Sequence, residues 1–287
     1  KLQGDHEVIV WNRSPEAIDD LRLKIKDLKV AGSIEELAKS LGIPRVVWIM
    51  VPAGAVEEVL LGVQPLMSRG DVIVDGGNSF YKDTERRFAD FEKAGIKFLG
   101  VGVSGGLSAS KNGYPLMAGG SRQAYDFIKP ILDSLAKPNG GHEYFGTGGA
   151  GHFVKMVHNG IEYPIMQGLG EGFGVLANSS YNFDLLKIAK LYQKGTLISG
   201  FMLDRAVESL ENDPKLSGAM GIIGSASEEA IWTVEEAKKL GQPAEAIKQA
   251  IDFRKRSETE KEVQNSFAAK LVGALRIAFG GHQVKKK

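Results

Sequence analysis

Residues 146–163 read GTGGAGHFVKMVHNGIEY, a cluster of glycines followed by a run that predicts a helix. An α-helix turns about 100° per residue, so the helix gathers five polar side chains on one face. They are Lys155, His158, Asn159, Glu162 and Tyr163. Apolar residues take much of the remaining surface, as in a helix that buries one side. The polar face favours proton-transfer chemistry; the alternative is a solvated face with ordinary pairs between successive turns.

The glycines at 146–151 match G-x-G-x-x-G literally and open this helix. A dinucleotide fingerprint belongs instead in the first strand–helix–strand unit, with an acidic residue about 20 residues later at the end of a second strand. Here the residues that follow predict helix throughout. We therefore expect the glycines to let another backbone or a ligand approach the N-terminus of the helix.

Upstream of residue 149, short apolar runs alternate with helical patterns. The predicted strands are 7–11, 29–31, 45–51, 71–75, 97–103, 115–118 and 143–145. Ser14 and Pro15 predict one helix start, and Ser33 with Glu36 forms a capping box for another. Such alternation implies a Rossmann-like, doubly wound parallel sheet.

Downstream, the strand pattern stops and only helical segments follow. They are 151–178, 184–193, 199–211, 228–240, 244–255 and 258–279, the last ending at a glycine pair before His282. The sequence thus predicts a dinucleotide-binding domain over 1–148 and an all-helical substrate and oligomerisation domain over 149–287.

Composition excludes several classes of function. Lys plus Arg number 36 against 35 acids, a net charge of +1, so no basic field argues for nucleic acid. The chain has no cysteine, which rules out disulfides and thiolate catalysis and suits the cytoplasm. Its histidines form no H-x-x-x-H pair, so we expect no metal. No apolar run approaches the roughly 18 residues of a membrane span, and no signal peptide is visible.

Ligands of open α/β sheets bind beyond the carboxyl ends of the strands. Four predicted loops follow strands: 12–14, 52–54, 75–79 and 104–106. Each alone is an ordinary turn, but together they predict one crevice. The residues expected to contact a dinucleotide there are Asn12, Arg13, Ser14, Val51, Pro52, Ala53 and Asn78.

Arg13 bears on the choice of cofactor. A site for NAD places an acid near the ribose hydroxyls, whereas an arginine there accommodates the 2′-phosphate of NADP. Arg13 follows the strand and no acid accompanies it, so NADP is expected, with NAD possible. The chain starts at Lys1 without Met, and we expect the first strand and its glycine loop to be missing from these residues. Residues 1–287 alone should then bind dinucleotide poorly.

Six runs carry a resemblance to a known family: MVPAG at 50–54, DGGNS at 75–79, GVSGG at 102–106, LMAGG at 116–120, KMVHNGIEY at 155–163 and RIAFGGH at 276–282. They resemble the short form of decarboxylating 6-phosphogluconate dehydrogenase, a family within the β-hydroxyacid dehydrogenase superfamily. The similarity runs over essentially the whole chain. The wider superfamily shares the glycine-rich lead and the K-x-x-x-N pair but lacks the HNGIEY continuation.

The resemblance implies an NADP-linked oxidative decarboxylation of 6-phosphogluconate to ribulose 5-phosphate, as in the pentose phosphate pathway. Lys155 would remove the proton of the C3 hydroxyl, and Glu162 would protonate the enediol. The sugar acid would be held by Asn78, Ser104, Gly105, Gly106, His158 and Asn159. Its phosphate would be held by Tyr163, Arg254 and Arg276. The family's phosphate-binding lysine before a Trp-Thr pair has no match here, where Glu228 and Glu229 precede Trp232.

The resemblance also implies a homodimer or homotetramer in which Arg276 and His282 reach the neighbouring subunit's site. The alternative for Arg276 is to complement the C-terminal end of its own helix. Two other functions stay open: a 3-hydroxyacid dehydrogenase without decarboxylation, and a non-catalytic ligand-binding protein on this fold. Glu162 and Asn78 argue against the first, and the retention of Lys155 argues against the second.

Overall fold

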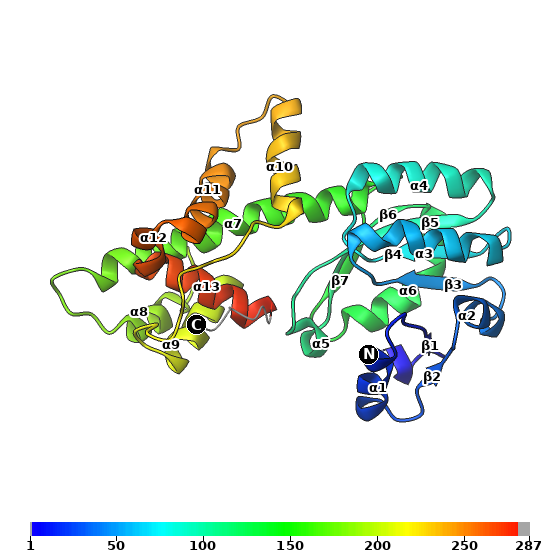
Figure 1. Ribbon diagram of the computed structural model, residues 1–287, viewed down its shortest axis with the longest axis horizontal. Coiled ribbons are helices and arrows are strands. Elements are labelled where there is room, and N and C mark those ends of the chain that lie inside the picture. Colours follow the sequence, from blue (N-terminus) through cyan, green and yellow to red (C-terminus); the bar gives the residue numbers. More distant parts are fainter. Residues whose placement is uncertain (1, 281–287) are drawn as a thin grey trace. The chain divides into compact units, whose positions relative to one another are not determined.

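The structure is a computed structural model that describes residues 2–280 (Figure 1). By its internal contacts the chain divides into two units, Lys1–Lys155 and Met156–Lys287. The division falls within α7 (Ala150–Ala177), a helix of 28 residues that contributes to both units. The domain boundary expected between residues 148 and 149 stays a prediction.

A five-stranded sheet organises the first unit, in the order β3-β4-β5-β6-β7. Its strands are β3 (Val46–Ile49), β4 (Val72–Asp75), β5 (Lys97–Val103), β6 (Pro115–Gly120) and β7 (Gly141–Tyr144). The first three are parallel, β6 is antiparallel to β5, and β7 is parallel to β6. The doubly wound fold is confirmed, but the sheet is mixed and not parallel throughout. Residues 104–114 hold only the four-residue helix α5 (Ala109–Asn112), too little for the crossover of about a dozen residues that a parallel strand needs.

The first predicted strand is shorter than expected and lies apart from this sheet. β1 (Ile9–Val10) pairs in parallel with β2 (Lys29–Val30) as a separate two-stranded sheet. A short 3₁₀ turn, η1 (Leu2–Gly4), precedes β1. Just after this turn, Nε2 of His6 lies 3.0 Å from Oγ of Ser134.

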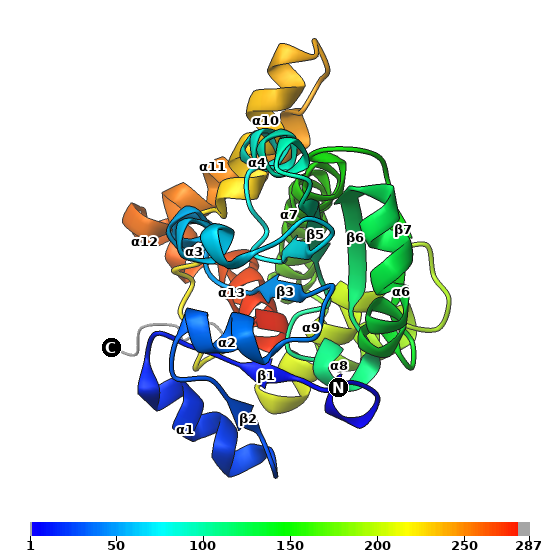
Figure 2. The same cartoon turned by 90° about the vertical axis from the view of Figure 1, so that its right-hand side faces the viewer.

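Helices cover both faces of the five-stranded sheet, as expected of a doubly wound fold (Figures 1 and 2). Val72, Val74, Leu99 and Val101 pack with Ile128 and Leu132 of α6 (Arg122–Ala136). Ile73 and Phe98 face the other way, against Leu60 of α3 (Val56–Val63) and Phe91 of α4 (Tyr81–Lys93). Successive residues of a strand point to opposite faces, so continuous apolar strands fill both layers.

Helix starts follow the predicted signals in part. Ser33 accepts the N–H of Glu36 at 3.1 Å and begins α2 (Ile34–Ser40), which confirms that cap. Ser14 is at the N-cap of α1 (Pro15–Lys24), but its side chain makes no capping bond. Two 3₁₀ turns, η2 (Ala53–Ala55) and η3 (Gln64–Leu66), flank α3.

The described part of the second unit is helical and has no strand. After α7 come α8 (Leu185–Tyr192), α9 (Phe201–Asn212), α10 (Glu228–Lys239), α11 (Glu245–Thr259), α12 (Lys261–Asn265) and α13 (Phe267–Gly280). Its core includes Met166, Phe173, Leu203, Leu210 and Leu271. The single helix predicted over 258–279 is wrong. The chain breaks at Glu260 and again at Ser266, whose hydroxyl accepts the N–H of Ala269 at 3.1 Å and starts α13.

Candidate active site

Three of the predicted loops follow β3, β4 and β5. These strands are parallel, so their carboxyl ends meet at one edge of the sheet. Val51, Pro52 and Ala53 follow β3, and Pro52 is the N-cap of η2. Asn78 follows β4, and Ser104, Gly105 and Gly106 follow β5. The structure thus brings these seven predicted residues to the same edge of the first unit.

Asn78 ties the β4 loop to the end of β5. Its Oδ1 accepts the N–H of Val103 at 2.8 Å, and its Nδ2 donates to the Val103 carbonyl at 3.2 Å. Its φ of +54° lies in the left-handed region, which asparagine tolerates better than most residues. Because Nδ2 carries two N–H groups, the bond to Val103 does not exhaust its donors. The same side chain can hold the loop and still offer a donor to a ligand.

Asp75 lies behind Asn78 and is fully buried. Its Oδ1 accepts the N–H of Gly77 at 3.0 Å, and its Oδ2 accepts the Ser79 hydroxyl at 2.7 Å and Arg87 Nη1 at 3.2 Å. Buried carboxylates need such partners to remain ionised. Sequence reasoning placed Asp75 in a loop motif but missed this role. The available signal was an acid that ends an otherwise apolar strand.

Lys155 is buried at the first turns of α7, with 5% of its surface exposed. Its stem lies against Gly102 of β5. One turn earlier, Gly151 lies so close to the backbone of Gly100, Met117 and Gly119 that a Cβ there would fall 2.4–2.6 Å from their atoms. The glycines therefore admit another backbone to the start of the helix, which confirms one of the two uses expected for them.

His152 is a buried group that sequence reasoning missed. Its Nδ1 lies 2.7 Å from Thr84 Oγ1 of α4, and its ring contacts the Gly100 position. Among the described residues, Nε2 has no hydrogen-bond partner. Burial lowers the pKa of the imidazole, so the ring is neutral at physiological pH. Its spacing of three residues from Lys155, one helical turn, was the signal available in the sequence.

The other predicted residues of α7 continue along the same helix into the second unit. The helix has no break between Ala150 and Ala177, so the predicted helix is confirmed. His158 Nδ1 lies 3.0 Å from Asn159 Oδ1. Glu162 follows on the same face, two turns after Lys155.

Tyr163, Arg254 and Arg276 gather within the second unit. The Arg254 guanidinium lies 3.5 Å from the centre of the Tyr163 ring, a close cation–π contact. Burial lowers the pKa of Arg254 to about 10; Tyr163 and Glu162 oppose this, and the nearby charge of Arg276 adds to it. Ser227 donates its N–H to the Tyr163 oxygen at 2.6 Å, and Arg276 Nη1 donates to the Ile223 carbonyl. A buried arginine beside a partly buried one is suited to bind an anion.

Asn12, Arg13 and Ser14 form a turn after β1. Asn12 Oδ1 accepts the Ser14 N–H at 2.8 Å. Arg13 is largely exposed, 3.6 Å from the exposed carboxylate of Glu58. Its guanidinium is therefore accessible to a ligand. His282, the remaining predicted residue, lies outside the described residues.

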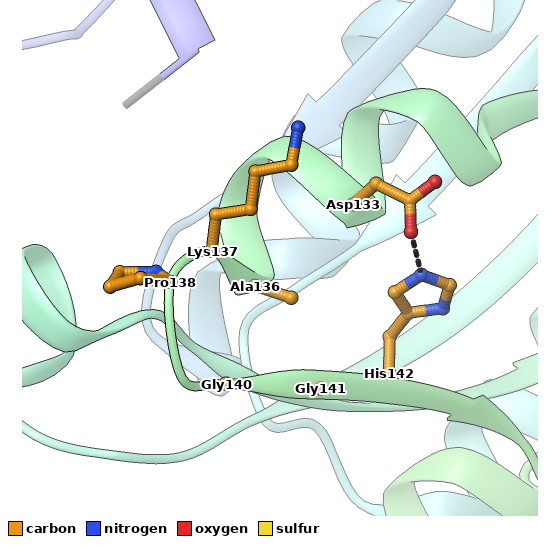
Figure 3. A pocket seen from close by; sticks show the side chains of 7 residues that line it. All are labelled: Asp133, Ala136, Lys137, Pro138, Gly140, Gly141 and His142. Atoms are coloured by element: carbon orange, nitrogen blue, oxygen red, sulfur yellow. Dashed lines mark hydrogen bonds and ion pairs between the residues drawn. The ribbon is translucent and has the colours of Figure 1, made fainter.

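A cavity of about 360 Å³ elsewhere in the first unit contains none of the predicted site residues (Figure 3). It is lined by Asp133, Ala136, Lys137, Pro138, Gly140, Gly141 and His142. His142 bridges Asp133 at 2.9 Å and Tyr125 at 2.9 Å through its two ring nitrogens. These contacts join α6 to β7.

Residues 2–280 contain no cluster of three or more His, Asp or Glu side chains that could hold a metal ion. Within the same residues, no helix is long and apolar enough to cross a membrane.

Two family models together match nearly the whole chain. The model described as the NAD binding domain of 6-phosphogluconate dehydrogenase matches residues 2–149. The model described as the C-terminal domain of 6-phosphogluconate dehydrogenase matches residues 151–287.

Individual relatives agree with these models. A Bacillus subtilis protein that carries the provisional name 6-phosphogluconate dehydrogenase is 38% identical over 100% of this chain and 94% of its own length. The NAD(+)-dependent, decarboxylating 6-phosphogluconate dehydrogenase of Haloferax volcanii is 35% identical, over 100% of this chain and 93% of its own length. Some relatives are longer: the chain spans 56% of the decarboxylating enzyme of Synechocystis.

Solved structures show the same likeness. Plasmodium falciparum 6-phosphogluconate dehydrogenase, described in apo form and with NADP+ and 6-phosphogluconate, has a TM-score of 0.81 and 31% identity, covering 89% of this chain and 58% of its own. A 3-hydroxyisobutyrate dehydrogenase of Salmonella typhimurium has a TM-score of 0.68 and 20% identity, covering 92% of this chain and 90% of its own. At this identity the likeness is one of fold alone.

Proposed function

The chain belongs to the 6-phosphogluconate dehydrogenase family, and on this basis we propose that it oxidises and decarboxylates 6-phosphogluconate to ribulose 5-phosphate and CO2. The observation that carries the proposal is Lys155, buried against β5 on the helix that also bears Glu162. The electron acceptor is NAD(P), with NADP as the proposed preference.

The residues at the carboxyl edge fit a dinucleotide. The backbone turn at Pro52–Ala53 leads into the N-terminal end of α3, Asn78 retains a donor, and Arg13 presents an accessible guanidinium to a 2′-phosphate. When bound, the nicotinamide supplies the acceptor for the hydride from C3 of the substrate.

Lys155 and Glu162 divide the proton transfers between them. Lys155 takes the proton of the C3 hydroxyl as the C3–H bond is lost, giving a 3-keto acid. The C1 carboxylate then leaves as CO2, and its bonding electrons form the enediol. Lys155 returns a proton to the ketone oxygen, and Glu162 protonates the carbon that lost CO2. Both side chains lie on one face of α7, from which they can act on adjacent carbons of one substrate.

One group of residues is proposed to hold the sugar acid, and a second group is proposed to hold its phosphate. The sugar acid is held by Asn78, Ser104, Gly105, Gly106, His158 and Asn159. Gly105 and Gly106 have φ of +98° and +55°, a turn that favours glycine and lets backbone approach a ligand. Tyr163, Arg254 and Arg276 hold the phosphate, since their clustered positive charge suits a dianion.

We place the chain in a homodimer or homotetramer whose C-terminal segment, with Arg276 and His282, completes the neighbouring site. Arg276 also has contacts with its own chain, at Ile223 and near Arg254, so the assignment of Arg276 to one subunit or the other is open to direct test. The chain has no cysteine, and the proposed location is the cytoplasm.

One experiment tests the reaction. The full-length protein is assayed with 6-phosphogluconate, separately with NADP and NAD, while absorbance of the reduced cofactor and CO2 are both measured. Lys155→Met should lower turnover by about 100-fold or more while substrate still binds. Lys93→Met, at an exposed lysine of α4, is the control and should retain full activity. Reduction without CO2 would point to the non-decarboxylating alternative, and more than a tenth of wild-type turnover in Lys155→Met would contradict the base role.

A further inference from the structure

Arg87 of α4 joins two of the loops that follow parallel strands. Only 5% of its side chain is exposed, and an arginine is rarely buried so deeply unless it is paired with an acid. Its Nε donates to Glu57 Oε2 at 3.0 Å, and its Nη1 donates to Asp75 Oδ2 at 3.2 Å. One planar guanidinium therefore binds two carboxylates from different elements.

The two carboxylates lie next to the two loops proposed to contact the dinucleotide. Glu57 is in the first turn of α3, four residues after Ala53. Asp75 is the last residue of β4 and begins the loop that carries Asn78. The backbones of β3 and β4 are paired up to Ile49 and Asp75, and Arg87 adds a rigid side-chain bridge beyond the end of that pairing.

Asp75 connects Arg87 to the residues on either side of Asn78. The same carboxylate that binds Arg87 also accepts the Gly77 N–H and the Ser79 hydroxyl, on either side of Asn78. Asn78 is held in a left-handed conformation and is tied to Val103. A shift of Asp75 would release the loop at both flanks of this residue.

A neighbouring arginine supplies a natural comparison. Arg86 also binds Glu57, at 2.8 Å through Nη2, but its side chain is about half exposed and it has no bond to Asp75. The hydrogen bond from Arg86 lowers the pKa of Glu57. Burial acts to raise this pKa, and Arg87 adds to the lowering. Arg86 thus shares the carboxylate of Glu57 without bridging the loops.

We infer that Arg87 is a positioning residue for the dinucleotide, which holds the 51–53 segment and the 75–79 loop at the spacing that the cofactor needs. The inference rests on the proposed function, in that these segments are taken as the cofactor site. Arg87 itself touches neither cofactor nor substrate in this assignment. Its loss should therefore weaken cofactor binding more than substrate binding, in which Asn78 is one of six proposed contacts to the sugar acid.

Three variants separate positioning from folding. Arg87→Lys keeps the charge but offers a single ammonium, which cannot reproduce the two-sided fork. Asp75→Asn/Arg87→Gln removes both charges of the buried pair together, so no uncompensated charge is left in the interior. Arg86→Gln is the matched control, because it removes an exposed guanidinium from the same Glu57.

The full-length protein and each variant are titrated with NADP and with NAD by calorimetry, and their melting temperatures and steady-state constants are measured. We expect the cofactor Kd and KM to rise about tenfold or more in Arg87→Lys and in the double variant, since small displacements of binding groups are costly. The KM for 6-phosphogluconate should rise less than the KM for the cofactor, because Asn78 is the one proposed substrate contact in the displaced segments. Arg86→Gln should match the wild type in every constant.

Wild-type cofactor affinity in both Arg87→Lys and the double variant would overturn the inference, as would equal losses in Arg86→Gln. A fall in kcat with both KM values unchanged would show a structural role only and would also overturn it. The failure of the proposed function is distinct: the wild-type protein would bind dinucleotide but would not turn over 6-phosphogluconate. Absence of dinucleotide binding to the wild type would overturn both.

Discussion

The stem of Lys155 lies against Gly102, so closely that a Cβ added at Gly102 would come within 2.4 Å of the Lys155 Cβ. Real Cβ atoms do not approach so near, and Gly102→Ala must therefore displace the lysine or the strand. We expect activity to fall by about 100-fold, because misplacing a reacting group by about 1 Å has that effect. Steady-state assays with saturating cofactor measure it.

A second glycine controls for the substitution itself. Gly42 has no atom within 4 Å of an added Cβ and is exposed, so Gly42→Ala should leave kcat and melting temperature unchanged. Full activity in Gly102→Ala would mean that the position of Lys155 is not critical.

Glu162→Gln should affect the last proton transfer more than the redox step. The amide keeps the shape of the side chain but cannot donate a proton as a carboxylic acid can, so pentulose release should slow by about 100-fold. Rapid-mixing measurements should still show a first turnover of reduced cofactor and CO2. Steady-state rates equal to wild type would remove Glu162 from the acid role.

Arg13→Glu should move the cofactor preference from NADP toward NAD. It removes the accessible guanidinium and adds a negative charge facing the 2′-phosphate, so the ratio of kcat/KM for NADP over NAD should fall about tenfold or more. Arg22→Glu reverses another exposed arginine, paired to Asp19 at 3.4 Å on α1, and should leave the ratio unchanged. An unaltered ratio in Arg13→Glu would refute the assignment.

Subunit mixing tests whether Arg276 acts in the neighbouring site. Lys155→Met and Arg276→Ala subunits should each be nearly inactive alone. If Arg276 acts across subunits, one site in a mixed dimer has both residues intact, and activity should return toward about a quarter of wild type with random pairing. No recovery despite demonstrated subunit exchange would assign Arg276 to its own chain, where it already contacts Ile223.

Asp71 should make stability depend on pH. Burial raises the pKa of this carboxyl, but hydrogen bonds from the Ser68 and Arg45 backbone and from the Arg45 guanidinium outweigh that effect and hold the pKa below 3.8. Because the folded pKa lies below the unfolded one, the stabilisation is present above about pH 4 and is lost as pH falls through the folded pKa.

Asp71→Asn tests this directly. At pH 7 the variant should be less stable by about 2 kcal/mol, since Arg45 loses its buried partner. The difference in melting temperature should shrink as pH falls below about 4. Asp90→Asn, which breaks an exposed pair with Lys93 at 3.1 Å, should change little at any pH. A pH-independent difference for Asp71→Asn would contradict the ionic origin.

The elements with local signals could be predicted from the sequence. The glycine cluster, the apolar stripe and the caps place α7 and α2 within a residue or two of their observed bounds. The reversal of β6 could not be predicted in this way, because a strand has the same side-chain period in either direction. The break at Ser266 was missed because strong helix formers surround it, and a local hydroxyl bond decided the start of α13.

The candidate site divides in the same way. Strand-end positions brought Asn78 and Ser104 to one edge, as expected from parallel strands. The grouping of Tyr163, Arg254 and Arg276 came from family resemblance, since they are up to 113 residues apart (276 − 163). The bridge from Arg87 to Glu57 and Asp75 had no signal in spacing, because buried pairs form through tertiary packing.

The reversed strands also constrain the length of one segment of the chain. β6 and β7 run against the parallel strands, so the chain leaves β7 at the edge where β5 begins. α7 then runs back along β5, with Gly151 against Gly100 and Lys155 against Gly102. One residue inserted between Gly151 and Lys155 would turn the lysine by about 100° away from Gly102. This segment therefore cannot gain or lose a residue without moving Lys155 away from Gly102.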